Sequence, residues 1–288
     1  MSAWLLGAAA AFGWGLFDFL IRFSSRRTSG LQAVLIVLVA GATILLAAAL
    51  ALGEPVSPPI NGFWQTAIAG TAYACALTCG YRAFTIGPVS FVAPIVSAYP
   101  VLTTLWAVAN GFRPGMGEWL GVVSVLIGVA LVARFAAEQP RQNERTGWRP
   151  RIHALVYACS ACVLSSIAFI VGQLATQNDS ELSVTLYGRL WAIAAILPIA
   201  FANGISLHGA RSWLPLLIVM GGLDAMSLLA VNAAGSMEGA EYAVVIASTF
   251  GAVTVAMAVL ILKERLSMLQ CLGMACIFAG VIALSNHF

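Results

Sequence analysis

The chain has 288 residues, of which 61% are hydrophobic and only 9% are charged. A soluble domain carries roughly a quarter charged residues, so this composition excludes an ordinary soluble protein and favours one embedded in a bilayer. The net charge of +3 is too small and too scattered to indicate binding to nucleic acid.

The first apolar segment, residues 3–21, has no basic residue before it and is long enough to cross a bilayer. We interpret it as a retained helix, and a cleaved signal peptide is the alternative. Nine further apolar segments follow, separated mostly by short turns that contain glycine, proline or charge. They cover residues 33–52, 63–82, 89–109, 117–137, 153–174, 182–202, 213–234, 241–262 and 266–286. The sequence therefore predicts an all-α integral membrane protein with ten transmembrane helices.

The longest polar stretch runs from Glu138 to Arg151, at the middle of the chain. It divides the sequence into a five-helix repeat at 1–137, a linker at 138–150 and a second five-helix repeat at 151–288. Because five is odd, the second repeat starts from the opposite side of the membrane. The two repeats are therefore expected to be inverted relative to each other.

The two halves also resemble each other residue by residue. A shift of about 151 positions places Phe91 on Tyr242, Ser97 on Ser248, Tyr99 on Phe250 and Pro100 on Gly251. One more residue of shift places Gly121 on Gly273 and Gly128 on Gly280. Inverted membrane repeats usually hold a site between them and rock around it.

Basic residues are distributed on one side of the predicted bundle. The even-numbered connections hold only Arg113, whereas every odd-numbered connection contains arginine or lysine. Cytoplasmic loops carry an excess of these residues. We therefore expect a multi-pass protein of the cell inner membrane, with the odd-numbered connections and the central linker in the cytoplasm and both termini outside.

Local motifs connect this organisation to a known family. Trp14-Gly15 lies in the first helix, and the last connection carries Lys263-Glu264-Arg265, followed by Gly273 and Gly280. Together with the ten-helix order, these residues resemble the EamA type of the drug/metabolite transporter superfamily. The chain is most similar to bacterial exporters of aromatic or broad-range amino acids. It departs from the family where residues 111–118 lack a clear acidic turn like that at Glu264.

The resemblance implies ten helices around a central cavity that opens to one side at a time. The first, third, fourth, sixth, eighth and ninth segments would line that cavity. The second, fifth, seventh and tenth would lie more peripherally.

Two carboxylates lie within predicted membrane helices, where charge is costly and often functional. Asp18 follows Trp14 by one helical turn and can hold a proton or the ammonium of an amino acid; alternatively, it meets the interface near Arg22. Asp224 lies halfway along its segment, where a structural hydrogen bond to a neighbouring helix is the alternative. The Gly-x-Gly-Asp motif that a paired-aspartate membrane protease needs is absent.

The fourth and ninth segments carry matching helix breakers. Pro94 and Pro100 flank Ser97 and Tyr99, and Gly251 follows Ser248. Bent helices at matching places in two repeats indicate a site, because bending frees backbone carbonyls. We predict hinges at Pro94, Pro100 and Gly251, with an amino-acid head group held by Ser97, Tyr99 and Ser248.

Aromatic rings can stack on an aromatic or cationic substrate. The predicted substrate-binding residues are Trp14, Phe17, Asp18, Tyr81, Ser97, Tyr99, Asp224 and Ser248. Arg189 can bind a carboxylate, but a peripheral helix and a snorkelling path favour a structural role.

The leading hypothesis is a secondary exporter of amino acids, broad in range and favouring aromatic or apolar ones. An exporter of cationic drugs or other small metabolites is the alternative. A lipid-modifying membrane enzyme would need clustered catalytic groups, which the sequence does not contain, and a helical membrane assembly factor remains a further hypothesis. We predict no catalytic residues, metal ligands or cofactor. The expected partners are the amino-acid substrate, the lipid bilayer and protons, without nucleic acid; a monomer is compatible with this organisation.

Overall fold

The computed structural model describes residues 3–25, 28–111, 113, 115–135, 148–177, 179–204, 207–234, 237, 246–264 and 266–285. Across these ranges every regular element is helical. The elements in chain order are α1 (Ala3–Ser24), α2 (Gly30–Leu52), α3 (Phe63–Ile86), α4 (Val89–Val96), α5 (Pro100–Ala109), α6 (Met116–Phe135), α7 (Trp148–Thr176), α8 (Glu181–Ala202), the 3-10 helix η2 (Leu207–Trp213), α9 (Leu214–Ala234), α11 (Phe250–Leu260) and α12 (Met268–Ser285). Tyr242 and most of the predicted linker lie outside the described residues.

The predicted membrane segments appear as helices in the predicted order. Within the described ranges, six spans are long and apolar enough to cross a membrane, and three further apolar helices are shorter. Large apolar side chains such as Leu50, Trp64 and Phe201 are exposed on the outer surface. An apolar outer surface of this kind fits a lipid environment. The chain is therefore a multi-pass membrane protein.

Two helices extend clearly beyond their predicted segments, and other helix boundaries differ by fewer residues. α3 continues to Ile86, so Arg82 lies on the exposed side of a helix rather than in a connection. α7 begins at Trp148, within the residues predicted as linker. In both cases the helix extends beyond its apolar stretch, because hydropathy marks the lipid-facing part of a helix and not its last hydrogen-bonded turn.

The fourth segment is interrupted rather than merely bent. α4 ends before Ser97, and α5 starts at Pro100, while Pro94 lies inside α4. Proline has no N–H to donate to the preceding turn, which explains the interruption before Pro100. The ninth segment has a matching interruption at Thr249, just before Phe250 opens α11. The predicted hinge residues therefore flank, or lie within a few residues of, equivalent breaks in the two halves.

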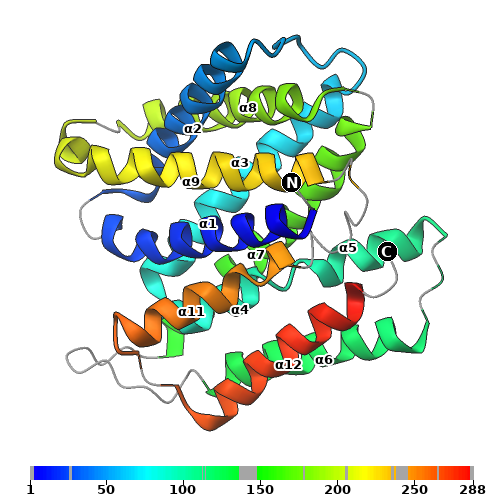
Figure 1. The fold of residues 1–288 in the computed structure, drawn as a ribbon. Coiled ribbons are helices and arrows are strands. Elements are labelled where there is room, and N and C mark those ends of the chain that lie inside the picture. The colour runs from blue at the N-terminus through cyan, green and yellow to red at the C-terminus, as the bar shows by residue number, and fades with distance from the viewer. Residues whose placement is uncertain are drawn as a thin grey trace.

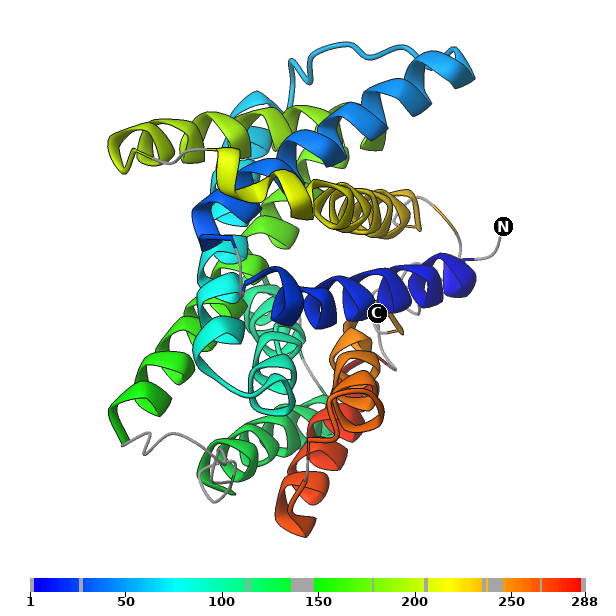
Figure 2. The same ribbon diagram turned by 90° about the vertical axis from the view of Figure 1, so that its left-hand side faces the viewer.

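The helices form a stack that runs from α2 and α8 at one end to α6 and α12 at the other (Figure 1). α1, α3, α7 and α9 lie between these ends, as the turned view also shows (Figure 2). α1 begins and α12 ends at the right-hand side of Figure 1.

The helix contacts between the halves occur in pairs that an internal twofold axis would interchange. α3 packs on α7 as α1 packs on α9, and α2 packs on α9 as α8 packs on α3. α1 meets α11 as α7 meets α4. The pairs α2 with α8, α4 with α11 and α6 with α12 each join equivalent segments of the two halves. This pattern is the one that two repeats related by an internal twofold axis produce.

Glycines show this symmetry at atomic detail. A Cβ at Gly128 would meet the carbonyl oxygen of Gly273, and a Cβ at Gly280 would meet that of Gly121. Ser124 donates a hydrogen bond of 2.8 Å to the carbonyl of Cys276, 152 positions away. α6 and α12 therefore pack antiparallel, with backbone against backbone, as small residues allow in membranes.

Candidate functional site

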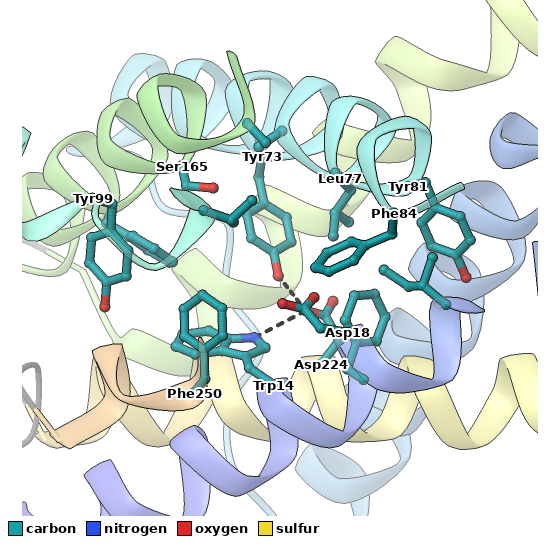
Figure 3. Close-up of a pocket in the computed structure, with 17 residues that line it drawn as sticks. Trp14, Asp18, Tyr73, Leu77, Tyr81, Phe84, Tyr99, Ser165, Asp224 and Phe250 are labelled. Carbon is teal, nitrogen blue, oxygen red and sulfur yellow. Dashed lines mark hydrogen bonds between the residues drawn. The ribbon is translucent and has the colours of Figure 1, made fainter. Parts of the chain in front are cut away.

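Asp224 of α9 is the centre of a buried polar network (Figure 3). Its Oδ1 accepts hydrogen bonds from Trp14 Nε1 on α1 at 3.2 Å and from the hydroxyl of Tyr73 on α3. Its Oδ2 pairs with Arg189 Nη2 on α8 at 2.9 Å. One carboxylate thus ties together four helices from both halves, and its charge is balanced by a guanidinium.

Arg189 does not snorkel to an interface as the sequence suggested. Its side chain is 1% exposed and that of Asp224 is 0% exposed. A Cβ at Gly41 on α2 would crowd Arg189 Nη1, so the absence of a side chain at Gly41 leaves room for the guanidinium. Only the snorkelling path is wrong, because the partner of Arg189 lies on another helix, 35 positions away.

Tyr73 and Asp224 occupy equivalent positions of the two repeats. They are 151 positions apart, which is the offset of the sequence repeat. Two equivalent residues can touch only where the internal twofold axis passes between them. The hydrogen-bonded pair therefore marks that axis at the centre of the bundle.

A pocket lies beside this network, between the two halves. The residues that line it come from α1, α3, α4, α7, α9 and α11, together with Tyr99 between α4 and α5. These elements belong to the six segments that the family resemblance places around a central cavity. The predicted residues that line the pocket are Trp14, Phe17, Asp18, Tyr81, Tyr99 and Asp224.

Equivalent positions of the two repeats face this pocket with different chemistry. The offset of 151 relates Trp14 to Ser165, Asp18 to Phe169 and Tyr99 to Phe250, and all six residues line the pocket. Within the first two pairs, one member is aromatic and the other polar or charged. The repeat thus places the pocket on the axis, and the side chains make its two halves chemically unequal.

Asp18 is the unsatisfied carboxylate of the pocket. Its side chain is buried, and its Oδ2 has no hydrogen-bond partner within the described part of the chain. It lies near Asp224 beneath the hydroxyl of Tyr73 (Figure 3). Asp18 therefore faces the central pocket rather than the outer surface near Arg22, and one of its oxygens remains available to a ligand.

Aromatic rings form much of the pocket wall around the carboxylates. The ring centroids of Trp14 and Phe169 lie 5.6 Å apart, and those of Tyr99 and Phe169 lie 4.9 Å apart. Phe250 stacks on Tyr99 at 6.5 Å, and Phe17 meets Tyr81 edge-on at 6.4 Å. Such a wall suits an apolar, aromatic or cationic group.

Ser97 and Ser248 are buried but do not line this pocket. The Ser97 hydroxyl donates to the carbonyl of Pro94 on α4 at 3.2 Å, just after that helix ends. A Cβ at Gly251 would collide with Ser97, so both residues belong to the close crossing of α4 and α11. The helix break turns Tyr99, and not Ser97, toward this pocket, and the predicted contact of Ser97 and Ser248 with a substrate head group stays a prediction.

Several pocket residues were missed from the sequence, namely Tyr73, Leu77, Phe84, Ser165 and Phe169. The repeat offset could have found Tyr73, Ser165 and Phe169, because each is equivalent to a predicted site residue. Within the described residues, no three side chains of His, Cys, Asp or Glu come together as a metal ion would require.

These features define a class of protein: a multi-pass membrane protein whose two helical halves enclose a pocket at their common axis. The chain belongs to the EamA-like transporter family, which matches residues 1–134 and 152–286. It is therefore a membrane transporter of small molecules. A comparison with curated proteins finds no match. Among solved structures, one crystal structure of a protein superposes with a TM-score of 0.66 at 17% identity, over 98% of this chain and 95% of that chain, which shows the fold alone.

Proposed function

We propose that this transporter exports amino acids across the cell inner membrane, with a broad range that favours aromatic and apolar side chains. The observation that carries the proposal is Asp18, a buried carboxylate with one unpartnered oxygen in an aromatic pocket between the repeats. A substrate ammonium would pair with Asp18, and an apolar side chain would pack on the rings of Trp14, Tyr99 and Phe250.

Alternating access follows from the position of the pocket on the internal axis. Each repeat would close over the substrate in turn, with the helix breaks next to Pro100 and Gly251 as the hinges. The distribution of basic residues favours odd-numbered connections in the cytoplasm.

Protons are the coupling partner that the site favours. An ionised carboxylate buried without a partner is costly, and either a proton or an ammonium removes that cost. Asp18 would release its proton when it pairs with the substrate ammonium and take up another proton after the substrate leaves. One carboxylate would thus exchange a proton for a cationic head group.

The test is uptake into liposomes that contain the purified protein, with a panel of amino acids and a lipophilic cation, with and without a pH gradient. We expect transport of aromatic and apolar amino acids that a pH gradient drives. Asp18→Asn should reduce transport at least tenfold, because it removes the charge that pairs with the ammonium. Glu54→Gln, which alters an exposed carboxylate, is the matched control.

The alternative is export of lipophilic cations, which the same carboxylate and aromatic wall also favour. Uptake of the cation alone, lost in Asp18→Asn, would support that alternative and contradict amino-acid export. Transport of no member of the panel would contradict both. Tyr99→Ala with unchanged transport would remove the aromatic wall from the proposed site.

A further inference from the structure

We infer that Arg189 is a second recognition group, which binds the carboxylate of the substrate and makes the transporter selective for zwitterions over simple cations. This inference rests on the proposed export of amino acids. It adds a residue that the central pocket alone does not contain.

The guanidinium of Arg189 is only partly satisfied. Its Nη2 pairs with Asp224 Oδ2, whereas its Nε and Nη1 have no hydrogen-bond partner in the described ranges. An arginine offers five N–H donors in a planar fork, and buried donors without partners are uncommon. The side chain is 1% exposed, so bulk water does not compensate these donors.

Arg189 lines a second pocket between α3, α7, α8 and α9. This pocket adjoins the central one, because Tyr73 and Phe169 line both. Its other polar side chains include Thr185 and Asn232, where Asn232 Nδ2 donates to Thr185 Oγ1 at 2.8 Å. A mostly apolar recess that contains Thr185, Arg189 and Asn232 thus lies next to the central pocket, and Tyr73 and Phe169 line both.

The unsatisfied charges in the two adjoining pockets are complementary to those of a zwitterion. Among the described residues, the buried charged side chains that keep atoms without partners are Asp18 and Arg189. Asp224 interacts with both groups, because it lies near Asp18 and is paired with Arg189. In the proposed binding mode, the ammonium pairs with Asp18 in the central pocket while the carboxylate of the same molecule turns toward Arg189 in the second pocket, and Asp224 holds Arg189 in place.

A simple amine would leave Arg189 without this second interaction. A site built to hydrogen-bond a group discriminates strongly against an analogue that lacks the group. A hydrogen bond to a charged group contributes on the order of tenfold to a hundredfold in affinity. Selectivity between an amino acid and its decarboxylated amine is thus the measurable consequence.

The experiment compares uptake of phenylalanine, phenethylamine and 3-phenylpropionate by protein in liposomes. The wild type should take up phenylalanine at least tenfold faster than either analogue. Arg189→Gln combined with Asp224→Asn removes both charges of the pair, so no buried charge is left alone. This double variant should lose most of the preference for phenylalanine over phenethylamine.

Arg134→Gln on α6 is the matched control, because Arg134 is exposed and lines neither pocket. It should keep the wild-type preference. If the double variant does not fold, thermal stabilisation of the wild type by each compound provides the same comparison, and only phenylalanine should raise the melting temperature markedly.

Equal handling of phenylalanine and phenethylamine by the wild type, or an unchanged preference in the double variant, would overturn the role of Arg189. Neither result would affect amino-acid export itself. Failure of the wild type to transport any amino acid would instead contradict the proposed function.

Discussion

At the scale of single residues, the two membrane carboxylates differ in how their oxygens are satisfied. Asp224 accepts from Trp14, Tyr73 and Arg189, so its charge is already balanced and its geometry is constrained from four helices. Asp18 keeps one oxygen without a partner in the same pocket. Asp224 is therefore suited to hold the site in place, and Asp18 is suited to bind what passes through it.

Removing the Asp224 charge alone should be strongly destabilising. Asp224→Asn leaves the buried guanidinium of Arg189 uncompensated, which we expect to lower the free energy of unfolding by about 3–5 kcal/mol. Adding Arg189→Gln should recover a large part of this loss, because the unpaired charge is then gone. Unfolding of the purified protein in detergent measures both. Equal stability of the single and double variants would contradict a pairing role, and Glu54→Gln should unfold like the wild type.

The residues of the site were accessible from the sequence to different degrees. Asp18, Tyr99 and Trp14 could be predicted because charge and aromatic rings are rare and placed on segments expected at the centre. The role of Arg189 could not, because its pairing with Asp224 depends on how α8 packs against α9. The sequence also did not indicate that Tyr99 lines the pocket while Ser97 does not, because it shows where a helix is weakened but not which side chains the resulting break turns inward.

At the scale of helices, Glu264 shows how an acidic turn of one half supports the other. Its carboxylate accepts hydrogen bonds from the backbone N–H of Val89 and Ser90, at 3.2 and 3.0 Å, and from the Ser90 hydroxyl at 2.6 Å. These donors lie at the start of α4, where N–H groups lack intrahelical partners and the helix dipole favours negative charge. The side chain after α11 thus caps a helix of the first repeat.

Neutralising this cap should weaken the protein moderately. Glu264→Gln keeps the shape but loses charge at the helix terminus, so we expect the free energy of unfolding to fall by about 1–2 kcal/mol. Glu54→Gln, in an exposed connection, is again the control in the same detergent unfolding assay. A Glu264→Gln protein as stable as that control would show that the cap contributes nothing measurable.

Two glycines of α6 provide a matched test of helix packing. A Cβ at Gly128 would come too close to the backbone of α12, whereas a Cβ at Gly117 would meet open space. Gly128→Ala should therefore lower the free energy of unfolding by about 1–3 kcal/mol through overpacking, while Gly117→Ala should be neutral or slightly stabilising. Thermal unfolding of the two variants side by side decides the matter. Similar effects of both substitutions would contradict the close packing of α6 against the backbone of α12 at Gly128.

At the scale of the whole molecule, the segments and the two-repeat organisation could be predicted because hydropathy and repetition are one-dimensional signals. The folded chain additionally shows where the internal twofold axis lies. Tyr73 meets Asp224 and Ser124 meets Cys276, and each pair joins equivalent positions of the two halves. If transport exchanges the conformations of the two repeats, the distance within such a pair is the same in both end states, because the exchange maps the pair onto itself.

The distance between non-equivalent positions of the two halves is not kept in such an exchange. Ser90 and Glu264 are not equivalent positions, so the exchange replaces their contact with a different one at the opposite end of the bundle. This end must therefore separate when the pocket opens toward it. Cross-linking a contact on the axis should therefore leave transport intact, whereas cross-linking a contact at one end of the bundle should stop it.

A short thiol cross-linker tests this difference. In a protein whose other native cysteines are replaced, Ser124→Cys with the native Cys276 should cross-link and keep transport. The protein with Ser90→Cys and Glu264→Cys should also cross-link, but it should then lose transport. Transport should return when a cleavable cross-linker is used and is then cut. Variants that carry one cysteine of each pair, treated in the same way, control for modification of a single site. Two results would contradict exchange of the two repeats about this axis: transport that continues with Ser90 and Glu264 cross-linked, or transport that stops with Ser124 and Cys276 cross-linked. The reason is that only a contact between equivalent positions is unchanged by that motion.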